Sequence, residues 1–306
     1  RRIIEIIISC DKKQTVISHK TSGFNNFSKN QILEILLISG CWPFIKQRPY
    51  DVIADPNDSP KSIFISTLNT APISADFEII LNEQKDEFIS GINALKKLTE
   101  GDLNICIEKN HNSFINDIND IKIHNISGVH PAGNVGVQIH HIDPINSGEK
   151  VWVVGAEDVA LIGKLFITGQ YNPTRTIAVS GPPVKYPQYY KTIVGSSLFE
   201  IIKDAGINSD LDLRFINGDV LTGRSVERDN YLGFYNNTLS VLREGNHYRM
   251  FGWIPFINNA VPSKYKTSFS WLFPNKKYDL DTNLNGEERA FVVTGEMEDV
   301  FPMDIF

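Results

Sequence analysis

Runs of β-branched residues alternate with amphipathic helical stretches through the first half of the chain, and this alternation restricts the fold more than any other feature. Strands that alternate with helices imply an α/β layered domain. The expected strands span residues 1–9, 62–68, 103–107, 121–126 and 151–154, and the expected helices span residues 29–39, 75–98 and 156–168. The first strand is mostly isoleucine, so we expect it to be buried on both faces.

Two of these helices carry clear end signals. Ser28 and Gln31 form a capping-box signature, and Gly40 stands where the helix over residues 29–39 should end. The helix over residues 156–168 is mostly apolar and is followed by Gly169. We expect the α/β domain to end near this second helix.

The second half of the chain has a different pattern, with mostly strands and one predicted helix. Strands are expected at 174–180, 185–194 and 211–216, with a Pro-rich turn at 181–183 and a helix at 197–204, an order that suits a small β-grasp module. Strand candidates beyond Gly223 lie at 238–243, 248–253 and 289–293. The sequence therefore predicts a Rossmann-like α/β domain over 1–165, a β-grasp domain over 166–222, and a mainly β segment over 223–306.

Composition excludes several classes of function. The formal net charge is -6, which leaves no basic footprint for a nucleic-acid backbone. The longest apolar runs are far shorter than the roughly 20 residues that span a bilayer. Cys10, Cys41 and Cys106 stand far apart, so they encode neither a disulfide framework nor an iron–sulfur cluster, and a reducing cytosol fits best.

The stretch over residues 128–144 holds His130, His140 and His141 between glycines and prolines. Its apolar residues fit the period of a strand and one face of a helix equally well, so pattern alone does not predict its secondary structure. The stretch is either a functional loop or a structural corner. Neutral imidazoles suit zinc, copper or iron, which raises a metal-binding enzyme as an alternative. Adjacent His140 and His141 point apart in either helix or strand, which weakens that alternative.

A second candidate follows the capped helix at residues 39–49, where Trp42 and Phe44 stand near two cations and two prolines. Such a loop forms either a ligand rim or a rigid connector, and composition favours the connector. The glycine-rich fingerprints of nucleotide-binding loops are missing, and so is the Gly-x-Ser-x-Gly elbow of hydrolases.

Several motifs together resemble the NqrA component of the bacterial sodium-translocating NADH:quinone reductase (Nqr), along the entire chain. They are Gly-Cys-Trp-Pro-Phe-Ile-Lys-Gln-Arg-Pro at 40–49, Ser-Thr-Leu-Asn-Thr-Ala-Pro-Ile-Ser-Ala-Asp at 66–76, His-Pro-Ala-Gly at 130–133 through Asp-Pro at 143–144, and the segments 158–169, 231–233 and 251–253. The resemblance implies a core like the flavin-bearing subunit of complex I, with a Rossmann-like domain followed by a soluble-ligand-binding (SLBB) β-grasp domain. It also implies a further domain before Arg1 and a helical segment after Phe306.

The resemblance further implies a subunit on the cytoplasmic face of the inner membrane that binds no cofactor. FAD, FMN and iron are expected in partner Nqr subunits, some of them integral to the membrane, and this chain is expected to support assembly and to have a link to ubiquinone. A flavin-dependent NADH dehydrogenase module is the alternative. It is disfavoured because Cys41-Trp42-Pro43-Phe44 stands where the flavin-bearing relatives have a glycine-rich loop.

Two expectations about the site follow. Trp42 and Phe44 should be buried and should fill the hollow that flavin occupies in those relatives. A quinone head needs apolar walls and a few donors, so one hypothesis is that Arg48 and His130 face one cleft at the carboxyl ends of the strands. The alternative is that Arg48 pairs with a carboxylate and His130 only hydrogen-bonds the backbone. The quinone-site candidates are Trp42, Phe44, Arg48, His130, Pro131, Gly133 and His140.

Overall fold

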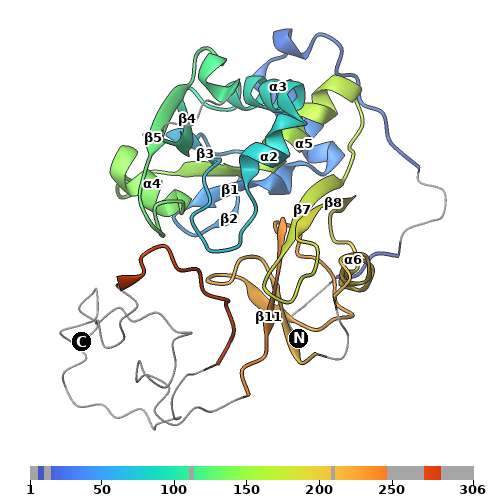
Figure 1. The fold of residues 1–306 in the computed structure, drawn as a ribbon. Coiled ribbons are helices and arrows are strands. Elements are labelled where there is room, and N and C mark those ends of the chain that lie inside the picture. Colours follow the sequence, from blue (N-terminus) through green and yellow to red (C-terminus); the bar gives the residue numbers. More distant parts are fainter. Residues whose placement is uncertain (1–5, 10–14, 110–113, 208–210, 247–271, 284–306) are drawn as a thin grey trace.

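The computed structural model describes residues 6–9, 15–109, 114–207, 211–246 and 272–283 (Figure 1). Six strands form the first sheet, in the order β2-β1-β6-β3-β4-β5. They are β1 (Ile45–Arg48), β2 (Val52–Ile53), β3 (Ser62–Ser66), β4 (Asp102–Glu108), β5 (Lys122–Ile126) and β6 (Val151–Gly155). The strands β6, β3, β4 and β5 run parallel, whereas β1 is antiparallel to both of its neighbours.

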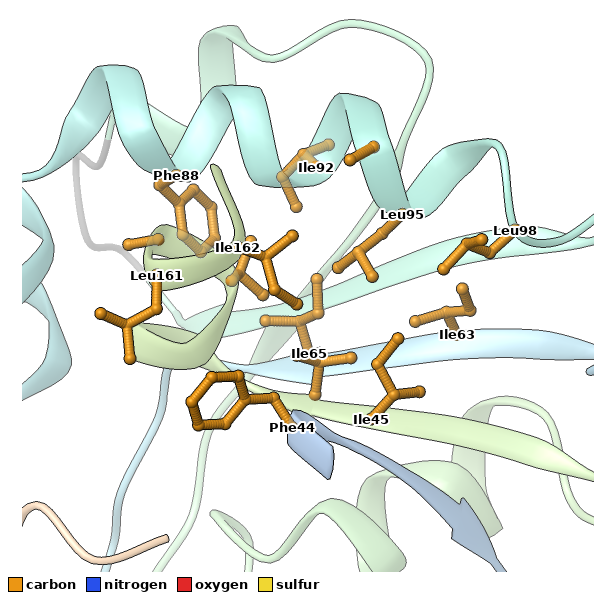
Figure 2. Close-up of a cluster of buried hydrophobic side chains, with 14 of the residues drawn as sticks. Phe44, Ile45, Ile63, Ile65, Phe88, Ile92, Leu95, Leu98, Leu161 and Ile162 are labelled. Atoms are coloured by element: carbon orange, nitrogen blue, oxygen red, sulfur yellow. The ribbon is translucent and has the colours of Figure 1, made fainter. Parts of the chain in front are cut away.

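Helices cover both faces of this sheet. They are α1 (Lys29–Ser39), α2 (Phe77–Asn82), α3 (Lys85–Lys96), α4 (Val135–Ile142) and α5 (Ala156–Thr168), with short 3-10 turns η1 (Phe24–Asn26), η2 (Trp42–Phe44) and η3 (Phe114–Asp117). Successive strand residues point to opposite faces, so Ile63 and Ile65 join the core under α3 and α5 (Figure 2). Phe64 joins the core under α4 on the other face. Burial on both faces explains why these strands read as continuous apolar runs.

The second sheet has the order β10-β9-β11-β7-β8 and carries one helix. Its elements are β7 (Thr174–Ser180), β8 (Gln188–Ile193), α6 (Leu198–Asp204), β9 (Leu213–Asn217), β10 (Arg224–Val226) and β11 (Thr238–Arg243). Leu198, Ile201 and Ile202 of α6 pack with Ile177 and Leu239 of the sheet. This mixed sheet with one covering helix confirms the predicted β-grasp arrangement.

Most predicted elements are confirmed, and the capping box at Ser28 is present in full. The helix predicted over 75–98 is two helices, because Gln84 leaves the helical region at φ -131° and ψ 34°. The stretch over 128–144, which pattern left open, contains the helix α4. The segment 39–49 is neither a rim nor a plain connector, because it forms η2 and then the strand β1.

The N-terminal strand prediction was wrong where the structure describes it. Residues 6–9 are not in a strand, and Ile6, Ile7 and Ile8 are 76%, 60% and 80% exposed. Residues 1–5 lie outside the described residues, as do the strand candidates at 248–253 and 289–293. An apolar run forms a strand only where a neighbouring strand pairs with it, and here no such neighbour is described.

The first sheet and its helices end with α5, and the second sheet begins with β7. Two strands from beyond residue 222, β10 and β11, complete this second sheet by pairing with β9 and β7. The proposed domain limits remain a prediction. Among the described residues, no helix is both long and apolar enough to cross a membrane.

Candidate functional site

Open α/β sheets bind ligands at the carboxyl ends of their strands, at the point where the strand order reverses. In this protein the reversal falls at β3, which pairs with β4 on one side and β6 on the other. Ser66 at the end of β3 is in register with Gly155 of β6 and with Cys106 of β4. The helix α5 begins immediately after Gly155, so its N-terminus faces this crevice.

Side chains of this protein occupy the crevice. Glu157 and Asp158 form the first turn of α5, where negative charge complements the helix dipole. Arg175 comes from β7 of the second sheet and is 2% exposed. Its guanidinium donates to Asp158 Oδ1 and, over 2.8 Å, to the carbonyl of Phe234. One buried arginine therefore joins the first sheet's crevice to the second domain.

Glu157 is only partly satisfied in this cluster. Its Oε1 accepts a hydrogen bond from the amide of Thr176 at 2.5 Å. Its Oε2 lies 3.7 Å from Nε of Arg175, and neither Oε2 nor Nε has a hydrogen-bond partner. Burial raises the pKa of Glu157 to about 7, although the charge of Arg175 and the Thr176 amide oppose the shift. The carboxyl of Glu157 can therefore take up a proton near neutral pH.

The loop between β5 and α4 brings His130 to the same carboxyl edge. His130 Nδ1 lies 3.3 Å from Thr70 Oγ1, and this hydroxyl also accepts the amide of Gly133 at 3.0 Å. Burial opposes ionisation of nearby Asp219, but hydrogen bonds from Thr222 and Leu221 and the charge of His130 hold its pKa below the usual value. His130 and Gly133 thus both contact Thr70 in the loop that follows β3, and the charge of His130 acts on Asp219 of the second domain.

A pocket of about 330 Å³ opens beside this loop, between the two domains. Asn69 contributes from the first domain, and Asn217, Asp219, Tyr235, Asn236 and Thr238 contribute from the second. The amides are largely used within the protein: Asn236 donates to Asn217 over 2.7 Å, and Asn217 donates to the carbonyl of Tyr231 over 3.2 Å. The pocket is polar, and it lacks the apolar walls that a quinone head requires.

Trp42 and Phe44 are buried, as expected, with 4% and 1% exposure. Trp42 Nε1 donates to the carbonyl of Ala54 over 2.8 Å, and its ring meets Trp152 edge to face at 5.5 Å. Phe44 stacks on Phe234 with ring centroids 5.0 Å apart. Both rings therefore serve the core and the domain junction and are withdrawn from any open surface.

Arg48 and His130 do not face one cleft, so the one-cleft hypothesis was wrong. Because β1 is antiparallel, its last residue Arg48 pairs with Val151, which in turn pairs with Ser62 at the start of β3. Arg48 thus lies at the amino edge of the parallel strands, where it meets Asp51 at 3.4 Å. His130 follows β5 and lies at the carboxyl edge.

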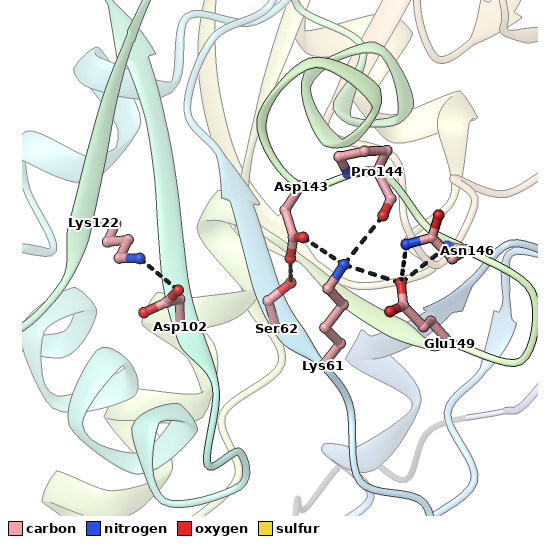
Figure 3. Close-up of polar contacts among 8 residues, drawn as sticks. All are labelled: Lys61, Ser62, Asp102, Lys122, Asp143, Pro144, Asn146 and Glu149. Atoms are coloured by element: carbon pink, nitrogen blue, oxygen red, sulfur yellow. Dashed lines mark hydrogen bonds and ion pairs between the residues drawn. The ribbon is translucent and has the colours of Figure 1, made fainter.

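The other end of α4 also reaches the amino edge. Lys61 contacts Asp143 at 2.6 Å and Glu149 at 3.0 Å, and Ser62 donates to Asp143 (Figure 3). His140, in the last turn of α4, is exposed and lies against the ring of His141. The candidate residues therefore divide between the two edges of the sheet.

The described part of the chain contains no group of three or more histidine, cysteine, aspartate or glutamate side chains that could hold a metal ion. His124, which lies near the histidine-rich stretch, instead contacts the amide oxygen of Asn104 at 2.8 Å. Its pKa is lowered, first by burial and then by the charge of Lys122. The geometry of the described histidines gives the metal alternative no support.

Sequence reasoning missed the residues that lie where the two domains meet. Arg175 contacts Asp158 and lies near Glu157, and Asn69 and Asp219 line one pocket. One signal was present: Glu157 and Asp158 are two adjacent acids that open an otherwise apolar helix, which indicates a buried cationic partner. Nothing in the local pattern names Arg175 as that partner.

The fold and the site now define a class of protein. Residues 27–171 match the family model described as NqrA second alpha/beta domain, and residues 176–228 match the model described as NQRA C-terminal domain, of SLBB type. The chain is thus an α/β domain with a mixed sheet, followed by a mainly β SLBB-type domain. The predicted fold class is confirmed.

Individual relatives identify the family. The chain is 36% identical to the NqrA component of the Na(+)-translocating NADH-quinone reductase of Photorhabdus laumondii, across 99% of the chain and 67% of the relative. It is 35% identical to the corresponding NqrA component from a Marinomonas species, across all of the chain and 68% of the relative. The chain therefore belongs to the NqrA family of Na(+)-translocating NADH-quinone reductases, and it spans about two thirds of the length of these relatives.

A solved structure supports the fold alone. The structure of an air-oxidised NAD+-reducing [NiFe]-hydrogenase superposes with a TM-score of 0.52 at 13% identity, covering 74% of this chain and 48% of that one. At this level of identity only the arrangement of elements is shared.

Proposed function

We propose that this chain is part of a sodium-translocating NADH:quinone reductase, binds no flavin and serves as a structural component on the cytoplasmic side. The observation that carries the proposal is the occupied crevice at the reversal of strand order. There, Glu157 and Asp158 stand at the N-terminus of α5 and Arg175 of the second domain lies against them. Membership of the NqrA family supports the assignment to this complex.

The residues present do not fit a flavin phosphate or a nucleotide phosphate. A helix N-terminus binds phosphate through free amides and positive dipole charge, and two carboxylates in the first turn of α5 oppose that charge. After α1, where a glycine-rich cradle would be needed, Trp42 and Pro43 add bulk, and Pro43 removes an amide donor. Both places that could cradle a phosphate are closed by this protein's own side chains.

The proposal includes partners and location. Other Nqr subunits are the expected partners, and they would carry FAD, FMN and iron. The chain would lie peripherally on the cytoplasmic face of the bacterial inner membrane. This arrangement is consistent with the described helices, none of which is suited to cross a bilayer.

The visible absorption spectrum of the purified chain tests the absence of flavin. We expect no flavin band and no oxidation of NADH with an artificial acceptor, in buffer alone or after incubation with excess FMN followed by desalting. Flavin retained in stoichiometric amount would contradict the proposal and would favour the dehydrogenase alternative.

We also propose that any quinone contact made by this chain involves His130, Pro131 and Gly133. These three candidates share one loop at the carboxyl edge, whereas Arg48 and His140 lie toward the other edge and Trp42 and Phe44 are buried. In the assembled complex, His130→Ala should lower quinone reduction and leave NADH oxidation with an artificial acceptor unchanged. His141→Ala, an exposed histidine on α4, is the matched control. Equal loss of both activities in His130→Ala would indicate a defect of assembly and would contradict a quinone contact.

A further inference from the structure

A second pocket lies away from the carboxyl edge, where the linker between the two sheets passes the ends of two helices. Its volume is about 650 Å³, larger than the pockets of about 360, 330 and 220 Å³ elsewhere in the described part of the chain. Its walls come from the segment 15–19, the end of α1, the second half of α5, residues 170–174 and the end of β8. This volume falls in the range of about 300–1,000 Å³ that is typical of small-molecule sites.

The charge of this pocket is opposite to that of the whole chain. The chain carries 36 acidic and 30 basic residues, and the three smaller pockets are each lined by at least one aspartate or glutamate. Among the described residues, the lining of the large pocket includes no aspartate or glutamate, but it includes Lys164 and His19. An acid-free pocket with a lysine favours an anionic ligand.

Two of the donors that line this pocket, on Lys164 and Tyr171, have no acceptor within the described residues. Within the described residues, Lys164 Nζ forms no hydrogen bond and no ion pair, and the hydroxyl of Tyr171 likewise contacts no acceptor. Burial raises the pKa of Tyr171 to about 12, so its hydroxyl remains a donor at neutral pH. An ammonium and a neutral phenol are therefore both available to an oxygen anion.

The rest of the lining is aliphatic and incompletely covered. Val16, Ile17 and Ile38 line the pocket while 47%, 69% and 62% exposed, and Pro173 and Ile193 add further apolar surface. The end of the segment 15–19 is tied to the linker, because the amide of His19 donates to Gly169 over 2.7 Å and Gln170 donates to Ser18 over 3.0 Å. A ligand with an apolar body would cover this exposed aliphatic surface.

We propose that this pocket binds an amphipathic anion, with an aliphatic chain against Val16, Ile17 and Ile38 and a terminal carboxylate or phosphate at Lys164. The inference does not depend on the proposed function, because the pocket shares no residue with the carboxyl-edge site. The charged group would gain a charge-assisted hydrogen bond, and the chain would remove exposed aliphatic surface from water.

Calorimetric titration with octanoate tests the proposal, with octan-1-ol and acetate as probes that each lack one half of the ligand. We expect octanoate to bind at one site per chain, and the other two probes to bind at least about tenfold more weakly. Lys164→Gln should weaken octanoate binding about tenfold and abolish the preference over octan-1-ol. Lys164→Arg should retain the preference because it keeps the charge.

Lys203→Gln is the matched control, since Lys203 is exposed on α6 and lines none of the described pockets. Melting curves of all variants show that each is folded, and Tyr171→Phe provides a second variant that should weaken octanoate binding without changing charge. Octanoate binding that does not saturate, or that Lys164→Gln and Lys203→Gln reduce equally, would overturn the proposal. So would equal affinity for octanoate and octan-1-ol.

A carboxylate and a lipid headgroup could both supply this chemistry, and vesicle flotation distinguishes them. Flotation of the chain with phosphatidylglycerol vesicles, lost in Lys164→Gln and not seen with phosphatidylcholine, would identify a membrane lipid as the ligand. Saturable, Lys164-dependent octanoate binding without flotation would identify a soluble carboxylate.

Discussion

Trp42 contributes to stability through its burial, its contact with Trp152 and the hydrogen bond of its ring nitrogen. Replacing it with alanine leaves a cavity beside Trp152 and removes the hydrogen bond to the carbonyl of Ala54. We therefore expect Trp42→Ala to lower the free energy of unfolding by about 3–5 kcal/mol in urea denaturation. Tyr50→Ala is the control, because Tyr50 is 84% exposed and its loss should change stability by less than about 0.5 kcal/mol. Similar losses in both variants would show that Trp42 is not part of a packed core.

Gly133 and Gly136 stand three residues apart, and replacing each with alanine should change the stability of the protein in opposite directions. A Cβ at Gly133 would lie 2.7 Å from the amide nitrogen of Thr70, whereas a Cβ at Gly136 meets no atom within 4 Å. Gly133→Ala should destabilise the protein by about 1–3 kcal/mol. Gly136→Ala, in the helix α4, should stabilise it by up to about 1 kcal/mol. Thermal unfolding of the two variants checks both signs, and a neutral Gly133→Ala would mean that the loop does not approach Thr70 so closely.

The helix α5 begins with a carboxyl that titrates in the neutral range. The pKa of Glu157 is raised from 4.5 to about 7 by burial, so the folded protein holds a proton that the unfolded chain has lost between these two values. Stability should therefore fall as pH rises through this window, by about 1–3 kcal/mol, and level off above it. Glu157→Gln mimics the protonated form and should remove this decline in denaturation curves recorded from pH 5 to pH 8.

The pair formed by Glu83 and Lys191 provides a control for this pH dependence. Both side chains are 65% exposed, so Glu83→Gln should leave the pH profile of stability like that of the unsubstituted chain. A profile for Glu157→Gln that keeps the full decline would assign the titration to another group.

The two domains are joined by a buried arginine that satisfies groups on both sides. Arg175→Ala would leave Asp158 and Glu157 buried without their cation and would free the carbonyl of Phe234. We expect a loss of about 3–5 kcal/mol, and in calorimetry a separation of the two domains into distinct unfolding transitions. Arg214→Ala removes a pair with Glu244 that is 41% and 24% exposed, and should cost less than about 1 kcal/mol. Equal effects of the two variants would contradict a structural role for Arg175.

Local pattern predicted much of the fold and little of the site. The bounds of α5 and β7 match the expected ranges because neighbouring residues carry both the hydrophobic periodicity of each element and the residues that end it. The strand β1 was missed because four residues between two prolines carry no period that pattern can detect. The loop of His130 lies at the carboxyl edge, as the sequence indicated, but its partner Thr70 is 60 positions away and cannot be recognised from the local pattern.

The sequence alone determined the alternation of strands and helices, the cap at Ser28, the β-grasp order and the bulk of Trp42 and Pro43 where a phosphate cradle would need glycine. These features depend on neighbouring residues, so a single chain segment encodes them. The direction of β1, which sends Arg48 to the amino edge, and the placement of Arg175 against Asp158 depend on which distant segments pair. Burial and hydrogen bonding across the complete sheet determine which strands pair, because the competing arrangements differ in energy only once the whole core has formed.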